Sequence, residues 1–378
     1  MGSILNFIEL FRENEFPDWC FFGPTNQKIN KSFSKTIYPE IKKGCNNFIL
    51  IEPTESFKGF TKYLQSNEII EFISFIKKNN IKLLLSSLAD PPTEENYINL
   101  VKELKKRDVY DNCYFITSNC NIVNDKTFSF HFFLEDYVKS KNLIFNQETD
   151  LGYTSKEILI EELDEYRNKK FLCFNKTIDK QHRYSLYHDY LSNDFSDSYF
   201  SFLELEGIHC NPYQGKIYEL DYYLKNIPIQ LDTNNNFNFT SSNTLKKELF
   251  LDSCIHLVTE TSFHDNELFL SEKLIKPIIN YQPFIVFGPH LYLKELKKIG
   301  FKTFSDFWDE SYDLIENPKD RYFQLSNLVL ELNKKSITDL NKLYKELKDI
   351  CIFNRDHINN LEISTFDYYF NNILNEKK

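Results

Sequence analysis

The apolar and polar positions of the chain alternate between short buried runs and segments with helical spacing. Short apolar runs that end in turn residues predict strands, and apolar positions three and four residues apart predict helices. In the first half, strands are predicted at 46–53, 81–90 and 112–119, with helices at 67–80 and 93–108. Strands that alternate with helices are typical of a parallel sheet with right-handed crossovers.

The second half shows the same alternation after a charged stretch at 155–170, which we expect to bridge two domains. Strands are predicted at 170–176, 199–205, 255–260 and 283–288, and helices at 182–193, 271–280 and 291–300. A polar loop is predicted at 231–244, and the last sixty residues are predicted to be mostly helical. The pattern therefore predicts two α/β halves followed by a helical tail.

Length and composition agree with a two-domain globular protein. The chain has 378 residues, of which 42% are hydrophobic and 26% charged. It has no apolar run long enough to span a bilayer and no basic leader typical of a signal peptide. The net charge of −10 argues against nucleic acid as a partner. The eight scattered cysteines indicate reduced thiols in a cytoplasmic setting, with peripheral membrane contact left open.

Several absent motifs exclude other enzyme classes. The nine glycines form neither a Gly-x-Gly-x-x-Gly fingerprint nor a P-loop, which argues against dinucleotide dehydrogenases of the common type and P-loop enzymes. No Cys/His group has zinc spacing, and no Asp-x-Asp segment is present to hold a metal diphosphate. The sequence therefore predicts no metal and no bound cofactor.

The segment "FLSEKLIKPIINYQPFIVFG" (269–288) carries the most specific chemistry. Ser271 is a good N-cap for the predicted helix, and Glu272 is favourable in its first turn. Lys273 has the wrong charge for a helix N-terminus, unless an anion binds there. A phosphate near Lys273 and a ribose on Glu272 would explain the arrangement. Ser-Glu-Lys is also a common surface tripeptide, so the alternative is a solvated helix start.

A wider set of segments resembles the donor-binding half of GT-B glycosyltransferases. "TE" (259–260) is followed by "FLSEKLIKPI", "PFIVFG" and "GFKTFSDFWDESYD", an order similar to alpha-1,3-fucosyltransferases and to bacterial and viral glycosyltransferases with a Ser/Thr-Glu-Lys motif. The upstream "FNKTIDKQHRYSLYHDYL" (174–191) resembles their Asn-Arg…His-Arg segment. The resemblance covers about residues 170–320.

The resemblance implies a GT-B fold, with two Rossmann-like domains facing a central cleft. We place an acceptor-side domain at 1–165, a nucleotide-sugar domain at 166–315 and C-terminal helices that pack back across the domains at 316–378. Glu272 would hold the ribose, and Lys273 and Arg183 the diphosphate. The donor-binding residues implied by the resemblance are Asn175, Lys176, Arg183, Glu260, Ser271, Glu272 and Lys273.

Three positions depart from the family pattern. Lys176 replaces a more usual arginine, Phe269 replaces a tyrosine, and Thr261-Ser262 replace Asn-Ser after Glu260. The last change leaves the role of Glu260 open.

Sugar transfer also needs a base for the acceptor hydroxyl, and charge stabilisation for the leaving diphosphate. GT-B enzymes use basic side chains and helix dipoles for the second task, so we expect metal-independent, inverting transfer. Asp90 follows the strand at 81–90 and is the first candidate base, with Glu94 and then Glu95 next. The alternative for Asp90 is a turn residue before Pro91-Pro92.

The sequence thus predicts a cytoplasmic glycosyltransferase that moves a sugar from a GDP- or UDP-sugar to a glycan or another hydroxyl acceptor. Two alternatives stay open. One is a non-catalytic nucleotide-binding or scaffold protein of the same fold, and the other is an enzyme related to nucleotide-sugar epimerases.

Overall fold

The computed structural model of the protein describes residues 20–21, 48–51, 56–65, 69–78, 82–87, 91–129, 131, 133–134, 137–138, 158–177, 180–204, 212–213, 247–264 and 267–361. The chain divides into two compact units. The first unit contains Met1–Lys139, Asn266–Phe269 and Glu362–Lys378, and the second contains Ser140–Asp265 and Leu270–Leu361. Each unit has its own sheet flanked by helices, so the predicted α/β class with parallel sheets is confirmed.

The sheet of the first unit has the strand order β1-β2-β3-β4-β5. Its outer strand β1 is antiparallel to β2, and all the other neighbours are parallel. The strands are β1 (Cys20–Phe21), β2 (Phe48–Ile51), β3 (Lys82–Ser87), β4 (Cys113–Thr117) and β5 (Thr127–Ser129).

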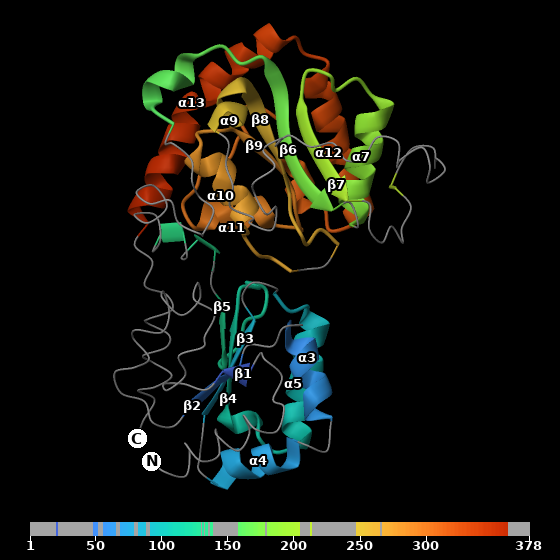
Figure 1. The fold of residues 1–378 in the computed structure, drawn as a ribbon, viewed down its shortest axis with the longest axis vertical. Coiled ribbons are helices and arrows are strands. Elements are labelled where there is room, and N and C mark those ends of the chain that lie inside the picture. The colour runs from blue at the N-terminus through green and yellow to red at the C-terminus, as the bar shows by residue number, and fades with distance from the viewer. Residues whose placement is uncertain are drawn as a thin grey trace. The chain divides into compact units, whose positions relative to one another are not determined.

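Helices cover this sheet and close the core of the first unit. They are α3 (Ser56–Leu64), α4 (Ile69–Lys78), α5 (Glu94–Lys106) and the short 3-10 helix η1 (Tyr110–Asn112). Helices α3 and α5 lie side by side (Figure 1). Phe57 and Phe60 of α3 pack with Leu104 of α5 and Phe115 of β4 in one buried cluster. The hydrophobic effect of burying these large side chains holds the unit together.

The sheet of the second unit has the strand order β7-β6-β8-β9, and every neighbouring pair is parallel. All residues of β8 and β9 are buried. Unbroken buried runs are typical of a parallel sheet that is covered on both faces. The strands are β6 (Lys169–Thr177), β7 (Tyr199–Glu204), β8 (Ser253–Thr259) and β9 (Phe284–Phe287).

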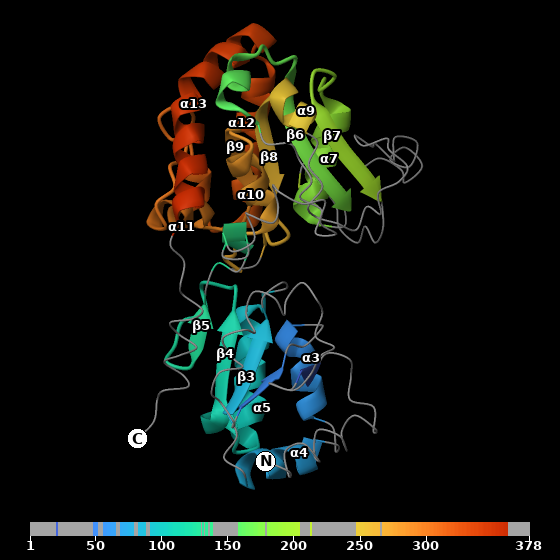
Figure 2. The ribbon, with the colours of Figure 1, turned by 60° about the vertical axis from the view of Figure 1, so that its left-hand side comes forward.

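Helices lie on both faces of this second sheet. Helices α7 and α12 pack together on one face, and α10 and α13 pack together on the other (Figures 1 and 2). The helices are η2 (Ile160–Asp164), α7 (Gln181–Ser192), α9 (Lys247–Asp252), α10 (Glu272–Ile279), α11 (Tyr292–Lys298), η3 (Ser311–Leu314), α12 (Pro318–Asn333) and α13 (Ile337–Asn360). The C-terminal helices α12 and α13 thus complete the second unit's core, with α13 contacting β6 and β8.

The pattern-based elements agree with the described strands and helices, within a few residues at their ends. The elements that it did not predict are the α-helices α3 and α9, the short 3-10 helices η1, η2 and η3, and the strands β1 and β5. The polar loop predicted at 231–244 lies outside the described residues. Among the residues that are described, no helix is both long and apolar enough to cross a membrane.

Candidate functional site

The second sheet has a topological switch point between β6 and β8. Strand β6 leads through α7 to β7 on one side, whereas β8 leads through α10 to β9 on the other side. Helices α7 and α10 therefore lie on opposite faces, and their first turns meet the same edge of the sheet (Figure 2). In open α/β sheets, ligands bind at the carboxyl ends of the strands next to such a point.

Asn175 of β6 joins the two strands at the switch point. The Thr259 hydroxyl at the end of β8 donates a 2.6 Å hydrogen bond to Asn175 Oδ1, and Asn175 Nδ2 donates to Cys173 Sγ at 3.2 Å. Asn175 is buried, so its amide serves these internal contacts. The neighbouring Lys176 belongs to β6, but its side chain is outside the described part of the chain.

Arg183 and His182, in the first turn of α7, bind the end of β8. Arg183 Nη2 donates to the carbonyl oxygens of Thr259 at 3.2 Å and Glu260 at 3.1 Å. His182 Nε2 lies 2.9 Å from the same Glu260 oxygen. Burial, together with the neighbouring Arg183 charge, holds the pKa of His182 well below its usual value. His182 is therefore neutral, and its Nε2–H donates to the carbonyl.

Glu260 is fully buried and accepts hydrogen bonds from two other elements. Ser271 Oγ donates to Glu260 Oε2 at 2.6 Å, and the backbone N–H of Ser271 reaches Oε1 at 3.4 Å. The Tyr292 hydroxyl of α11 donates to Oε1 at 2.6 Å. Burial and the Glu260 charge together raise the pKa of Tyr292 well above its usual value. The carboxylate of Glu260 thus fastens α10 and α11 to the end of β8.

The first turn of α10 has the predicted cap and an ion pair. Ser271 accepts a 3.1 Å hydrogen bond from Lys273 N and is the N-cap. Lys273 Nζ lies 2.8 Å from Glu272 Oε1. Burial raises the pKa of Glu272, but the charge and hydrogen bond of Lys273, together with Lys276, outweigh burial and leave it lowered. Glu272 is therefore ionised at neutral pH.

These contacts unite five of the predicted donor-binding residues at one edge. A chain of direct contacts runs from Arg183 through Glu260 and Ser271 to Lys273 and Glu272. The edge carries two cations, two carboxylates and a helix N-terminus, and the helix N-terminus is the part that favours an anion. Asn175 reaches this chain through Thr259.

Of the three predicted base candidates, which all belong to the first unit, Asp90 and Glu94 come first. Asp90 lies outside the described residues. Glu94 is the first residue of α5 and is exposed, directly after Thr93, whose side chain caps the helix by accepting from Asn96 N at 3.0 Å. The assignment of a base to either carboxylate stays a prediction.

Arg321 of α12 is a site neighbour that the sequence analysis missed. Its Nε donates to the Gly288 carbonyl after β9 at 3.1 Å, and its Nη2 donates to the Phe263 carbonyl. Nη1 donates to the carbonyl oxygens of Ile315 and Glu316. Burial lowers the pKa of Arg321 to about 10. This guanidinium holds the loops after β8 and β9 in place, and a lone arginine in a helical segment gives no sequence signal for such a role.

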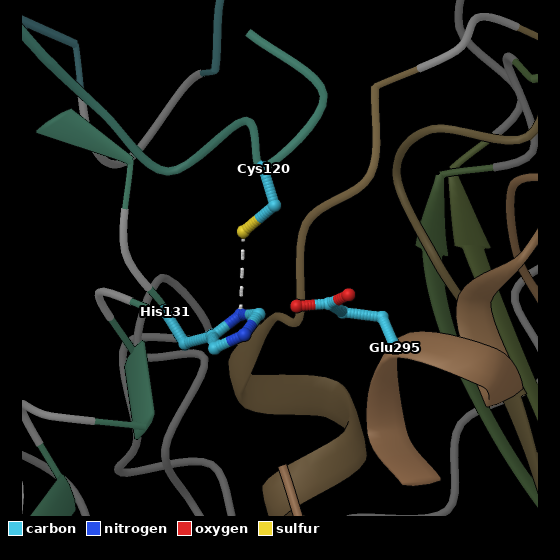
Figure 3. A group of neighbouring side chains, drawn as sticks. All are labelled: Cys120, His131 and Glu295. Atoms are coloured by element: carbon cyan, nitrogen blue, oxygen red, sulfur yellow. Dashed lines mark hydrogen bonds between the residues drawn. The ribbon is translucent and has the colours of Figure 1, made fainter. Parts of the chain in front are cut away.

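Cys120 and His131 are neighbouring residues of the first unit, and both are of metal-ligating types. Cys120 Sγ lies 3.5 Å from His131 Nδ1, and Figure 3 draws the pair together with Glu295, a residue of α11. Within the described part of the first unit this pair gives two ligands, whereas a structural zinc takes four. The first unit by itself therefore does not build a zinc site from this pair.

Comparisons with known proteins add little. No protein-family model matches the chain, and no curated protein matches it. The chain is similar to a solved structure described as an OtsA apo structure, with a TM-score of 0.37 and 12% identity over 88% of this chain and 74% of the other.

Proposed function

We propose that the protein is a GT-B glycosyltransferase that moves a sugar from a nucleotide sugar to a hydroxyl acceptor without a metal ion. The observation that carries the proposal is the position of Ser271, Glu272 and Lys273. Glu272 and Lys273 begin α10, and Ser271 caps it, at the switch point of a parallel sheet. Glu260 links this cap to Arg183 of α7. The ordered set of segments that resembles glycosyltransferases supports the same reading.

Each residue has a distinct role in this proposal. Lys273 and the positive N-terminal end of α10 bind the diphosphate, and Arg183 adds a second positive charge. Glu272 accepts hydrogen bonds from the ribose hydroxyls. Ser271 caps the helix, and Glu260 and Asn175 hold the capped turn and the strand end in register.

The reaction requires a defined movement of one proton and one electron pair. The acceptor oxygen attacks the anomeric carbon, and the bond from that carbon to the phosphate oxygen breaks. The nucleoside diphosphate leaves with the electron pair, and the acceptor proton passes to a carboxylate base, for which Asp90 and Glu94 are the candidates. Positive groups at the α10 N-terminus stabilise the charge that develops on the leaving group.

A turnover assay in the presence of EDTA tests the proposal. The protein is incubated with GDP- and UDP-sugars and a panel of hydroxyl acceptors, and the released nucleoside diphosphate is measured. We expect release that depends on the acceptor and falls in Lys273→Ala. Binding without turnover would favour a non-catalytic protein, and an altered sugar still joined to its nucleotide would favour epimerase-type chemistry.

A further inference from the structure

The ion pair between Glu272 and Lys273 occupies the two side chains that the proposed function assigns to the ligand. Their charged atoms lie 2.8 Å apart. We propose that this pair makes the site select nucleoside diphosphates over inorganic pyrophosphate. The inference rests on the proposed function, because it concerns the same site.

Lys273 is the partner that is free to move. Its side chain is 27% exposed, whereas that of Glu272 is 10% exposed. The backbone of the turn that carries both residues is fixed by two hydrogen bonds. The Ser271 hydroxyl donates to the buried Glu260 and accepts from Lys273 N. A ligand can therefore draw the lysine ammonium toward itself, while the Glu272 carboxylate stays where it is.

The cost of that movement depends on what the ligand offers to Glu272. A largely buried carboxylate that loses its hydrogen-bonded cation becomes less stable unless other donors replace that cation, although the charge of Lys276 still acts on Glu272. Pyrophosphate binds the Lys273 ammonium but has no hydroxyl group that could donate a hydrogen bond to the Glu272 carboxylate. A nucleoside diphosphate takes the ammonium with its phosphates and offers its two ribose hydroxyls to the carboxylate. Glu272 thus weakens the binding of pyrophosphate and strengthens the binding of the nucleoside diphosphate.

The test is calorimetric titration of the full chain with pyrophosphate and with GDP, UDP and ADP, all in EDTA. We expect the wild type to bind one nucleoside diphosphate more tightly than pyrophosphate. In Glu272→Gln the lysine is released and the carboxylate is gone, so pyrophosphate binding strengthens and nucleotide binding weakens. The ratio of the two dissociation constants falls by about tenfold, the usual worth of a hydrogen bond to a charged group.

The matched control is Asp164→Asn. Asp164 forms an ion pair with Lys348 at 2.7 Å in the same unit and is 68% exposed, so this variant changes the net charge equally without touching the site. We expect the selectivity ratio to stay at the wild-type value. Lys273→Gln serves as the second variant, and it should weaken both ligands by a similar factor, since both use the ammonium.

The outcomes separate the two proposals. If the wild type binds no nucleoside diphosphate, both the proposed function and this inference are wrong. If a nucleoside diphosphate binds but Glu272→Gln keeps the wild-type ratio, the function stands and the inference is overturned. Should Glu272→Gln unfold, a Lys273→Gln variant that weakens only one of the two ligands would overturn it equally.

Discussion

The hydroxyl of Ser271 donates a 2.6 Å hydrogen bond to the carboxylate of Glu260, a residue eleven positions earlier in the chain. Glu260 directly follows strand β8, and Ser271 is the N-cap of helix α10. Because the serine proton is committed to Glu260, the Ser271 oxygen keeps its lone pairs for the N–H of Lys273. The buried acid therefore sets both the place and the direction of the cap at the candidate site.

Replacing Glu260 with leucine should destabilise the second unit strongly. The change leaves the buried hydroxyls of Ser271 and Tyr292 without their acceptor, which we expect to cost about 3 kcal/mol of unfolding free energy. Urea denaturation gives the value. Tyr292→Phe is the control, since it removes one of these bonds to the carboxylate and should cost about 2 kcal/mol. A Glu260→Leu loss no larger than that of the control would show that the acid does not fasten the two helices.

Gly300, which follows helix α11, should not tolerate a side chain. Its φ angle is +95°, and a Cβ atom there would lie 2.7 Å from Cε1 of His357. We expect Gly300→Ala to lower the unfolding free energy by about 2 kcal/mol, since both the backbone conformation and the contact are unfavourable. Adding His357→Ala to the Gly300→Ala variant should restore the share of the unfolding free energy that the clash with His357 removes. Simple additivity of the two changes would contradict this explanation.

His256 in β8 should make stability depend on pH. Burial lowers its folded pKa to about 3, whereas an unfolded histidine titrates near about 6.5. The unfolded chain therefore binds the proton more readily, and stability is lost as the pH falls below the unfolded value. Between about pH 7.5 and about pH 5.5 this residue should account for about 1.4 kcal/mol of lost stability.

The variant His256→Leu should lack this component. The variant will be less stable at both pH values, because the hydrogen bond to Gln282 is lost. The informative quantity is therefore the change in its unfolding free energy between the two pH values. The buried His182 titrates in the same direction and remains in the variant, which keeps part of the wild-type slope. An equal pH dependence in wild type and variant would contradict the assignment to His256.

Much of the fold in both units could be predicted because its signals are local. Ser271 is followed by a first-turn acid and by apolar positions at helical spacing, and helix α10 begins where this pattern places it. Thr93 predicts the start of α5 in the same way. Helix α3 was missed because Gly59 interrupts a short segment, and β5 because it has three residues.

The contacts that organise the site could not be predicted, because they join distant parts of the chain. Glu260 reaches Tyr292 across 32 positions, and Arg183 reaches Thr259 across 76. Arg321 binds backbone carbonyls, which any sequence supplies. Residue types can suggest that an acid or a cation belongs to a site, but only the fold shows whether it faces a ligand or holds another side chain in place.

The most direct test of the account is calorimetric titration of the full chain with GDP, UDP and ADP in EDTA, repeated with Lys273→Ala. We predict that one nucleoside diphosphate binds the wild type and that the substitution weakens its binding about tenfold, through loss of a charge-assisted contact. Without ligand, Lys273→Ala should also lower the unfolding temperature, because the largely buried Glu272 carboxylate loses its cationic partner, so binding is measured at a temperature at which both proteins are folded. Absence of binding by all three nucleotides, or equal affinity in the variant, would contradict the account.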